Sequence, residues 1–85
     1  MSRTIRSSGH LAMVSSLVAA RTAAGLTQDQ LAARLHCHQS LIARIESGQR
    51  RVDVPELILL CRALEIEPAV VFENVNRAVP VEARI

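Results

Sequence analysis

The segment from Thr27 to Ser47 constrains the fold of this chain most, because it holds two short helical patterns separated by only about three residues. The first pattern starts at Thr27 and has Gln30 three positions later, the arrangement of a capping box at a helix start. The second pattern starts at about Gln39 and is followed by Gly48, a common helix terminator. This spacing predicts two short helices that pack across one another at a tight turn.

The apolar positions of this segment predict which sides of the two helices are buried. Ala32 falls where the helices are expected to cross, since a larger side chain would push them apart. The other inward positions recur at helical spacing and are Leu31, Leu35, Cys37, Ile42 and Ile45. The sides between them are polar and remain available to another molecule.

Three further helical patterns surround this pair, so we expect an all-α fold, a compact five-helix bundle. The first pattern covers about residues 10–24. A second capping box, Asp53 with Glu56, precedes a pattern that reaches about residue 64, and Pro68 can open the last one. The inward positions expected in the first and fourth helices are Leu11, Val14, Leu17, Val18, Leu57, Leu60, Cys61 and Leu64.

Length and composition allow one small domain with an aliphatic core. The chain has 85 residues, of which 49% are hydrophobic, and Phe72 is the only aromatic residue. We expect residues 1–9 to form a flexible basic N-terminal arm, with Ser8 as a possible helix cap, and residues 10–76 to form the folded domain. Residues 77–85 are expected to be a C-terminal tail, a short edge strand or a dimerisation arm.

The charge is distributed unevenly along the chain. Counting side chains gives a net charge of +3 for residues 1–24, +2 for residues 25–52 and −3 for residues 53–85. A basic first part and an acidic last part suit a protein that offers one face to a polyanion and another to a different partner. No stretch has the pattern of a signal peptide or a membrane span, so a cytoplasmic location is expected.

A family resemblance rests on two runs and one arginine: Gly25-Leu-Thr-Gln-x-x-Leu-Ala-x-x-Leu, then Gln39-Ser-x-Ile-x-Arg-Ile-Glu-x-Gly48, then Arg50. Together they resemble the Cro/repressor-type helix-turn-helix family, often called XRE-like, over about Leu17 to Phe72. The resemblance implies a phage-repressor type of DNA-binding domain over residues 10–76. It also implies a bacterial or phage transcriptional regulator, a repressor that binds a palindromic operator as a dimer. Neither catalysis nor a cofactor is expected.

The resemblance further implies a DNA-contacting set, carried over position by position: Gln28, Gln39, Ser40, Leu41, Ala43, Arg44 and Arg50. Gln39 would contact a base edge, with adenine favoured, and Arg44 could bind guanine in bidentate fashion. Ser40 would contact a base or a phosphate. Gln28 would contact a phosphate and support Gln39, and Arg50 would bind phosphate. Ala43 would face the groove beside Arg44, and Leu41 could touch a thymine methyl group or the sugar backbone.

One position departs from the family pattern. The turn residue His36 stands where the family usually has Gly, and this site tends to need a positive φ, which His adopts more readily than most side chains. We therefore expect a left-handed turn at His36.

Other interpretations of the polar residues are weaker. His36, Cys37, His38 and Cys61 could suggest zinc, but three adjacent residues cannot easily converge on one ion, so no metal is expected. Glu46 lacks a partner carboxylate for acid-base catalysis, and it is expected to pair with a basic residue instead.

Two alternative functions and one partner remain open at this point. The chain could be an antitoxin-like module that binds DNA and a protein, or a protein-interaction domain without DNA binding. Because one recognition helix contacts only a few base pairs, a homodimer is expected. Its interface would lie on the fifth helix, with the tail as a possible addition, and would involve Val70, Val71, Phe72 and Val75.

Overall fold

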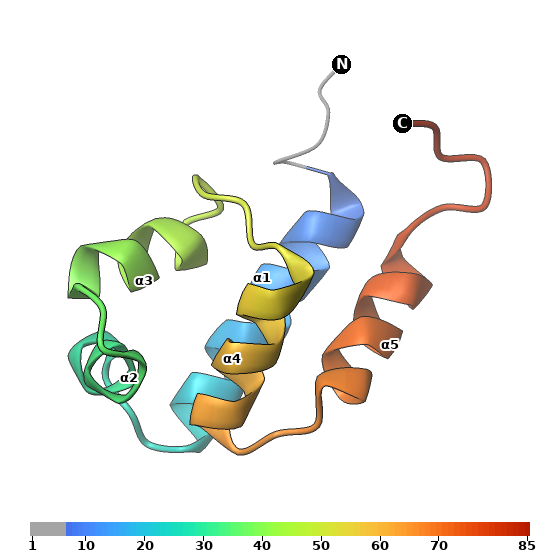
Figure 1. The fold of residues 1–85 in the computed structure, drawn as a ribbon. Helices are drawn as coiled ribbons and strands as arrows, with labels where there is room; N and C mark the ends of the chain where they lie inside the picture. Colours follow the sequence, from blue (N-terminus) through green and yellow to red (C-terminus); the bar gives the residue numbers. More distant parts are fainter. Residues whose placement is uncertain (1–6) are drawn as a thin grey trace.

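The computed structural model describes residues 7–85, which form five α-helices and no strand (Figure 1). The predicted all-α five-helix fold is therefore confirmed. The helices are α1 (Ser8–Ala23), α2 (Gln28–Leu35), α3 (Gln39–Glu46), α4 (Val54–Leu64) and α5 (Pro68–Ala78). None of the helices in this part of the chain is long and apolar enough to cross a membrane.

The N-terminal end of the domain starts earlier than expected. Most of the expected arm, residues 1–6, lies outside the described residues. The remainder is not an arm, because α1 already begins at Ser8. The cap is Ser7 rather than Ser8, since the Ser7 hydroxyl oxygen accepts a hydrogen bond of 3.1 Å from the backbone N–H of His10.

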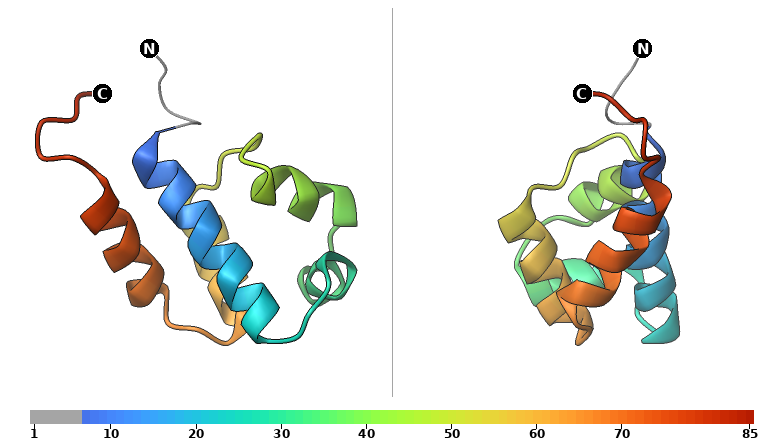
Figure 2. Two further views of the ribbon diagram at one scale, coloured as in Figure 1. Left: turned by 180° about the vertical axis from the view of Figure 1, so that it is seen from behind. Right: turned by 90° about the vertical axis from the view of Figure 1, so that its right-hand side faces the viewer.

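The helices form two groups around a shared core. α1, α4 and α5 run side by side, while α2 and α3 lie together at one edge of the bundle (Figures 1 and 2). α1 contacts α3, α4 and α5, and α2 contacts α3 and α4. This arrangement leaves one side of the α2–α3 pair outside the bundle, where a ligand can approach it.

The predicted capping boxes fix the starts of α2 and α4. The hydroxyl of Thr27 accepts from the Gln30 N–H at 3.1 Å, and the Gln30 side chain accepts from the Thr27 N–H at 2.8 Å. The Asp53 carboxylate accepts from the Glu56 N–H at 2.8 Å, and the Glu56 carboxylate accepts from the Asp53 N–H at 3.0 Å. Each pair satisfies two backbone donors that a helix start leaves unpaired.

The core is aliphatic, as the composition predicted. Its buried members are Met13, Leu17, Leu31, Ala32, Ile42, Ile45, Leu60, Cys61, Leu64 and Val71. The expected inward position Leu11 is wrong, because this side chain is 42% exposed. The buried side of α1 instead centres on Met13 and Leu17, and Leu11 lies about half a turn around the helix from Met13.

In the part of the chain that the structure describes, four residues with positive φ follow the ends of helices. Gly25 (φ 73°) follows α1 and Gly48 (φ 82°) follows α3. The predicted left-handed turn at His36 is confirmed, with φ 57° at the end of α2. Glu65 adopts the same conformation (φ 59°) after α4, which was not predicted from the sequence.

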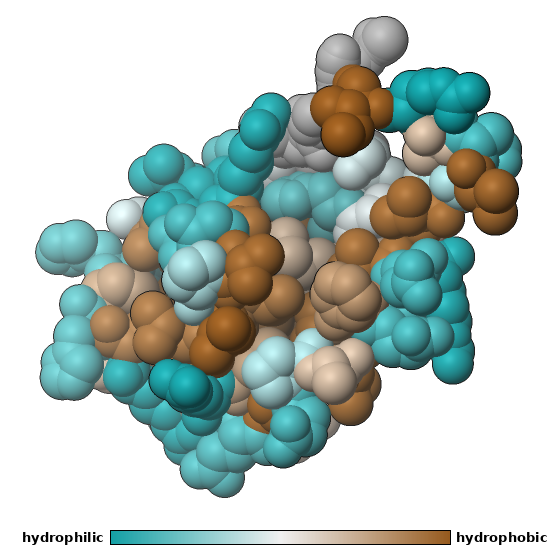
Figure 3. All heavy atoms as spheres, turned by 45° about the vertical axis from the view of Figure 1, so that its right-hand side comes forward, coloured by the Kyte–Doolittle hydropathy of each residue, from teal (hydrophilic) through white to brown (hydrophobic). Residues whose placement is uncertain are grey.

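Helix α5 divides its apolar residues between the core and the surface. Val71 and Val75 were expected in a dimer interface. Val71 is only 1% exposed and Val75 packs against the core, so neither side chain is freely available to a second molecule. Val70 and Phe72 are exposed by 58% and 67%. The space-filling view shows apolar side chains across the middle of the molecule and toward the tail (Figure 3).

The tail forms a turn rather than a strand. The Ala83 N–H donates to the Pro80 carbonyl at 3.1 Å, and the side chains of Val81 and Ile85 are fully exposed. Where α5 ends, it lies close to the start of α1, because a Cβ added to Gly9 would come within 2.8 Å of Val79 Cγ2. The lack of a side chain at Gly9 therefore allows this close approach of the two helices.

Candidate nucleic-acid interface

Helix α3 has a buried side and an exposed side. Ile42 and Ile45 are inside the core. Ser40, Arg44 and Ser47 are exposed and Ala43 is partly exposed, and together they form a stripe at the spacing of one helix face. Within residues 7–85, the Arg44 side chain takes part in no hydrogen bond or ion pair. The guanidinium of Arg44 therefore has its donors available for a ligand.

A chain of hydrogen bonds links both ends of α3 to the other helices. Glu46, the last residue of α3, accepts from Arg21 Nε at 2.7 Å and from Arg21 Nη2 at 3.0 Å. Glu46 Oε1 also accepts from Gln28 Nε2 at 2.9 Å. Gln28 Oε1 in turn accepts from Gln39 Nε2 at 2.6 Å, and Gln39 is the first residue of α3. The network therefore orients the whole of α3.

Arg21 and Glu46 form the partly buried centre of this network. Their side chains are only 17% and 8% exposed. The hydrogen bond with Glu46 raises the pKa of the Arg21 guanidinium above its ordinary value. Arg21 also donates to the Leu26 carbonyl at 2.7 Å, so it fixes the connection between α1 and α2.

Part of this network was predicted from the sequence. Gln28 was expected to support Gln39, and Glu46 was expected to pair with a basic residue. Arg21 was not predicted to be that residue. A signal existed, because Glu46 lies four positions after Ile42 on the inward side of a helix, where a carboxylate needs a cationic partner.

Leu41 lies on the edge of α3 that faces α4. It is partly buried against the core and lines an apolar groove of about 170 Å³. Leu59 and Leu60 of α4 form the opposite wall of the groove. Leu41 therefore has a packing role in addition to the DNA contact that the resemblance implies.

Arg50 already has a carboxylate partner within the protein. Its Nη1 and Nη2 atoms donate to the two Glu56 oxygens, both at 2.9 Å, and Nη1 also donates to the Arg51 carbonyl at 2.7 Å. The hydrogen bond from Arg50, followed by that from the Asp53 N–H, lowers the pKa of Glu56 to about 2. The expected phosphate ligand is thus engaged in an ion pair at the start of α4.

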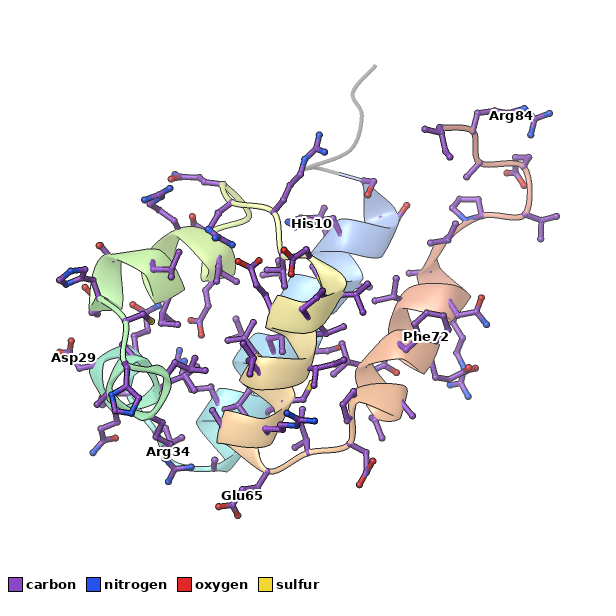
Figure 4. All side chains as sticks on the ribbon, in the orientation of Figure 1. His10, Asp29, Arg34, Glu65, Phe72 and Arg84 are labelled. Carbon is purple, nitrogen blue, oxygen red and sulfur yellow. The ribbon has the colours of Figure 1, made fainter. Side chains whose placement is uncertain are left out.

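The histidines and cysteines are not gathered in one place. Within residues 7–85, no group of three His, Cys, Asp or Glu side chains could hold a metal ion. Cys61 is fully buried, which raises the pKa of its thiol. His38 is the N-cap of α3 but makes no side-chain capping bond. Figure 4 places His10 far from α2, near the start of α1.

His10 has an unusual environment. Its Nε2 atom is buried and has no hydrogen-bond partner within the described part of the chain. Burial, and secondly the positive charge of Arg51, lower the pKa of His10. The loop after α3 therefore lies close enough to the start of α1 for Arg51 to influence it.

A model of a helix-turn-helix family matches residues 17–71 of the chain. Solved structures that are more than 30% identical to the chain include the following two. An XRE-family like protein from Pseudomonas syringae pv. tomato shares 36% identity, with 85% of this chain and 88% of that chain covered and a TM-score of 0.77.

The restriction-modification controller protein C.AhdI from Aeromonas hydrophila shares 35% identity, with 74% and 96% covered and a TM-score of 0.68. The clp gene regulator ClgR from C. glutamicum is 22% identical, with 87% and 96% covered, and its TM-score of 0.75 supports the fold alone. A comparison with curated protein sequences found no match.

Proposed function

This chain belongs to the XRE-type helix-turn-helix family, and from that membership we propose that it is a sequence-specific transcriptional regulator that binds double-stranded DNA. The observation that carries the proposal is the support of α3 at both of its ends. Glu46 is tied to Arg21 and Gln28, and Gln39 is tied to Gln28. This support leaves the stripe on the outer side of α3 in a defined orientation for entry into the major groove.

Each residue of the proposed DNA-contacting set has a role that its chemistry suits. Gln39 contacts a base edge, with adenine the geometric favourite, and Arg44 binds guanine through its planar fork. Ser40 contacts a base or phosphate, and Ala43 allows the backbone of α3 to approach the groove. Gln28, at the first position of α2, holds Gln39 and contacts phosphate with help from the helix dipole.

Leu41 completes the set from the edge of α3. Leu41 is only partly buried, and it would touch a thymine methyl group or the sugar backbone. Arg50 differs from the rest of the set, because its ion pair with Glu56 occupies the guanidinium that the resemblance assigns to a phosphate.

Fluorescence polarisation with duplexes from the region upstream of the gene, and with random duplexes, tests the proposal. The affinity should fall steeply with salt, because phosphate contacts release counterions. Arg44→Ala should weaken binding to the preferred duplex by about 10- to 100-fold, with little effect on binding to random DNA. Arg62→Ala, which removes an exposed arginine from α4, is the matched control for the lost charge.

Two results would argue against this function. Equal effects of Arg44→Ala on specific and random DNA would remove Arg44 from base contact. An absence of salt-dependent binding to any duplex would favour a protein-interaction domain instead.

We further propose that the regulator occupies a palindromic operator as a homodimer and acts as a repressor. Val70 and Phe72 of α5 would form the interface, with Val81 and Ile85 of the tail, because these are large apolar side chains left exposed. Figure 4 places Phe72 on the opposite side of the bundle from Asp29 of α2, so this interface would not compete with DNA.

The dimer is tested by the mass in solution. Phe72→Gln should shift the molecular mass from that of a dimer to that of a monomer in sedimentation at micromolar concentration. Leu59→Gln, which changes an exposed apolar residue on α4 beside α3, should leave the mass unchanged. A monomeric mass for the unmodified chain, also in the presence of operator DNA, would exclude the dimer.

A further inference from the structure

We propose that Arg50 is a positioning residue for the loop between α3 and α4, rather than a ligand of the DNA phosphates. This inference rests on the proposed function, since it concerns the same interface. In this role, the ion pair of Arg50 and Glu56 fixes the path of the backbone that follows α3.

The hydrogen bonds of the Arg50 guanidinium go to acceptors within the protein, and the side chains of Arg50 and Glu56 are 29% and 36% exposed. Both of its terminal nitrogens are bonded to the Glu56 carboxylate at 2.9 Å. This is the fork geometry with which arginine would otherwise grip a phosphate. The paired carboxylate also offsets the positive charge, so a phosphate that approaches Arg50 meets a nearly neutral pair.

The same guanidinium joins the loop to the start of α4. Arg50 Nη1 donates to the Arg51 carbonyl at 2.7 Å, which fixes the backbone of the next residue. Glu56 accepts from the Asp53 N–H at 3.0 Å, so its carboxylate is itself held by the capping box of α4. Arg50 therefore closes a ring of hydrogen bonds that includes both the loop and the helix.

The other end of the loop is attached to α3. The backbone N–H groups of Gln49 and Arg50 both donate to the Arg44 carbonyl, at 3.0 and 3.2 Å. The loop is thus held between α3, on one side, and the ring at the start of α4, on the other. The residues on either side of Arg50, Gln49 and Arg51, are exposed.

The two roles predict opposite effects for a change at Glu56. Glu56→Gln retains an oxygen for the Asp53 N–H but removes the negative charge that holds Arg50. If Arg50 were a phosphate ligand, this change would release it and tighten DNA binding. If Arg50 positions the loop, the same change weakens DNA binding.

The experiment compares Arg50→Ala, Arg50→Lys, Glu56→Gln and the double variant Arg50→Ala/Glu56→Gln. We expect each single variant to weaken operator binding by about three- to tenfold, and the double variant to be no weaker than either single one. The slope of log K against log salt should remain unchanged, whereas loss of one phosphate contact would reduce it by about 0.9. Arg50→Lys should bind no better than Arg50→Ala, because a lysine cannot form the bidentate pair with the Glu56 carboxylate.

The chain offers a matched control in the exposed ion pair of α5. Arg77 Nε and Glu73 Oε2 are 3.0 Å apart, four residues from one another. Arg77→Ala and Glu73→Gln make the same charge changes outside the loop, and each should leave the dissociation constant within about twofold.

Amide hydrogen exchange in the free protein gives a second readout. Arg50→Ala and Glu56→Gln should each accelerate exchange of the Gln49 and Arg50 amides by about fivefold or more, because the loop opens locally. Unchanged exchange, a salt slope reduced by about one, or tighter binding by Glu56→Gln would overturn the inference. If no duplex is bound at all, the proposed function fails, while the exchange rates still decide whether Arg50 positions the loop.

Discussion

Arg21 on α1 and Glu46 on α3, 25 positions apart in the chain, are joined by two hydrogen bonds of 2.7 and 3.0 Å. The pair fixes the end of α3 against α1. Because Gln28 donates to the same carboxylate, the pair also fixes the start of α2.

Glu46→Gln should lower the free energy of unfolding by about 2–3 kcal/mol, because the partly buried Arg21 guanidinium would lose its counter-charge. Urea denaturation measures this value. Glu73→Gln removes a carboxylate from an exposed pair and should cost less than about 0.5 kcal/mol. Equal losses for the two variants would mean that the burial of the first pair has no energetic importance.

Gln28→Ala should relax the preference for the base that Gln39 contacts by about three- to tenfold, because the Gln39 amide would lose the partner that orients it. Polarisation with duplexes that differ at that base pair measures the change. Asp29→Asn alters the next residue, which is exposed and outside the network, and serves as the control. Retention of the full preference in Gln28→Ala would show that Gln39 is oriented by DNA alone.

Substitutions at the residues with positive φ should change thermal stability in opposite directions, depending on whether glycine is introduced or removed. His36→Gly and Glu65→Gly should leave stability unchanged or raise it by up to about 1 kcal/mol, because glycine adopts this conformation without strain. Gly25→Ala should lower it by about 1 kcal/mol through backbone strain alone, since no atom beyond its chain neighbours lies within 4 Å of the added Cβ. Calorimetry measures all three, and clear destabilisation by His36→Gly would assign the His36 side chain a stabilising contact.

Glu56 gives the protein a component of stability that disappears in acid. Its pKa is about 2 in the folded protein, against an ordinary value of 4.5. The contribution is therefore complete above pH 4.5, and it is lost as the pH falls toward 2, because the unfolded chain takes up the proton first. Urea denaturation from pH 6 to pH 2 should show a smaller decline for Glu56→Gln, and identical declines would contradict the ion pair.

His10 should titrate below the ordinary histidine pKa of 6.5, because burial and the charge of Arg51 disfavour its protonation. As the pH falls below 6.5, the unfolded chain therefore binds a proton before the folded protein does, and the free energy of unfolding declines. An NMR titration, with the signal assigned through His10→Gln, measures the midpoint. A midpoint at or above 6.5 would place His10 in a more polar environment.

The sequence predicted those features whose causes are local. Thr27 and Asp53 each have a capping partner three residues away, so the starts of α2 and α4 follow from the chain itself. The turn at His36 was predictable for the same reason, because a resemblance over a few residues was enough to indicate a positive φ.

Features that depend on packing could not be predicted in this way. Leu11 and Met13 both occupy apolar positions of α1, and only the placement of the neighbouring helices decides that Met13 is buried. Val71 is buried in the core because α5 packs against α1 and α4, although the sequence of α5 alone fits an external interface equally well. Arg50 resembles a phosphate ligand until Glu56 is known to lie beside it.

The carboxylate of Glu46 serves three helices at once, since it holds Arg21 of α1 and Gln28 of α2 from the end of α3. A substitution of Glu46 that altered operator preference would therefore also destabilise the domain. Under the proposed function, new preferences would arise at Ser40, Ala43 and Arg44, whose side chains lie outside the buried core. The architecture thus separates positions that can diversify among related regulators from those that must stay together.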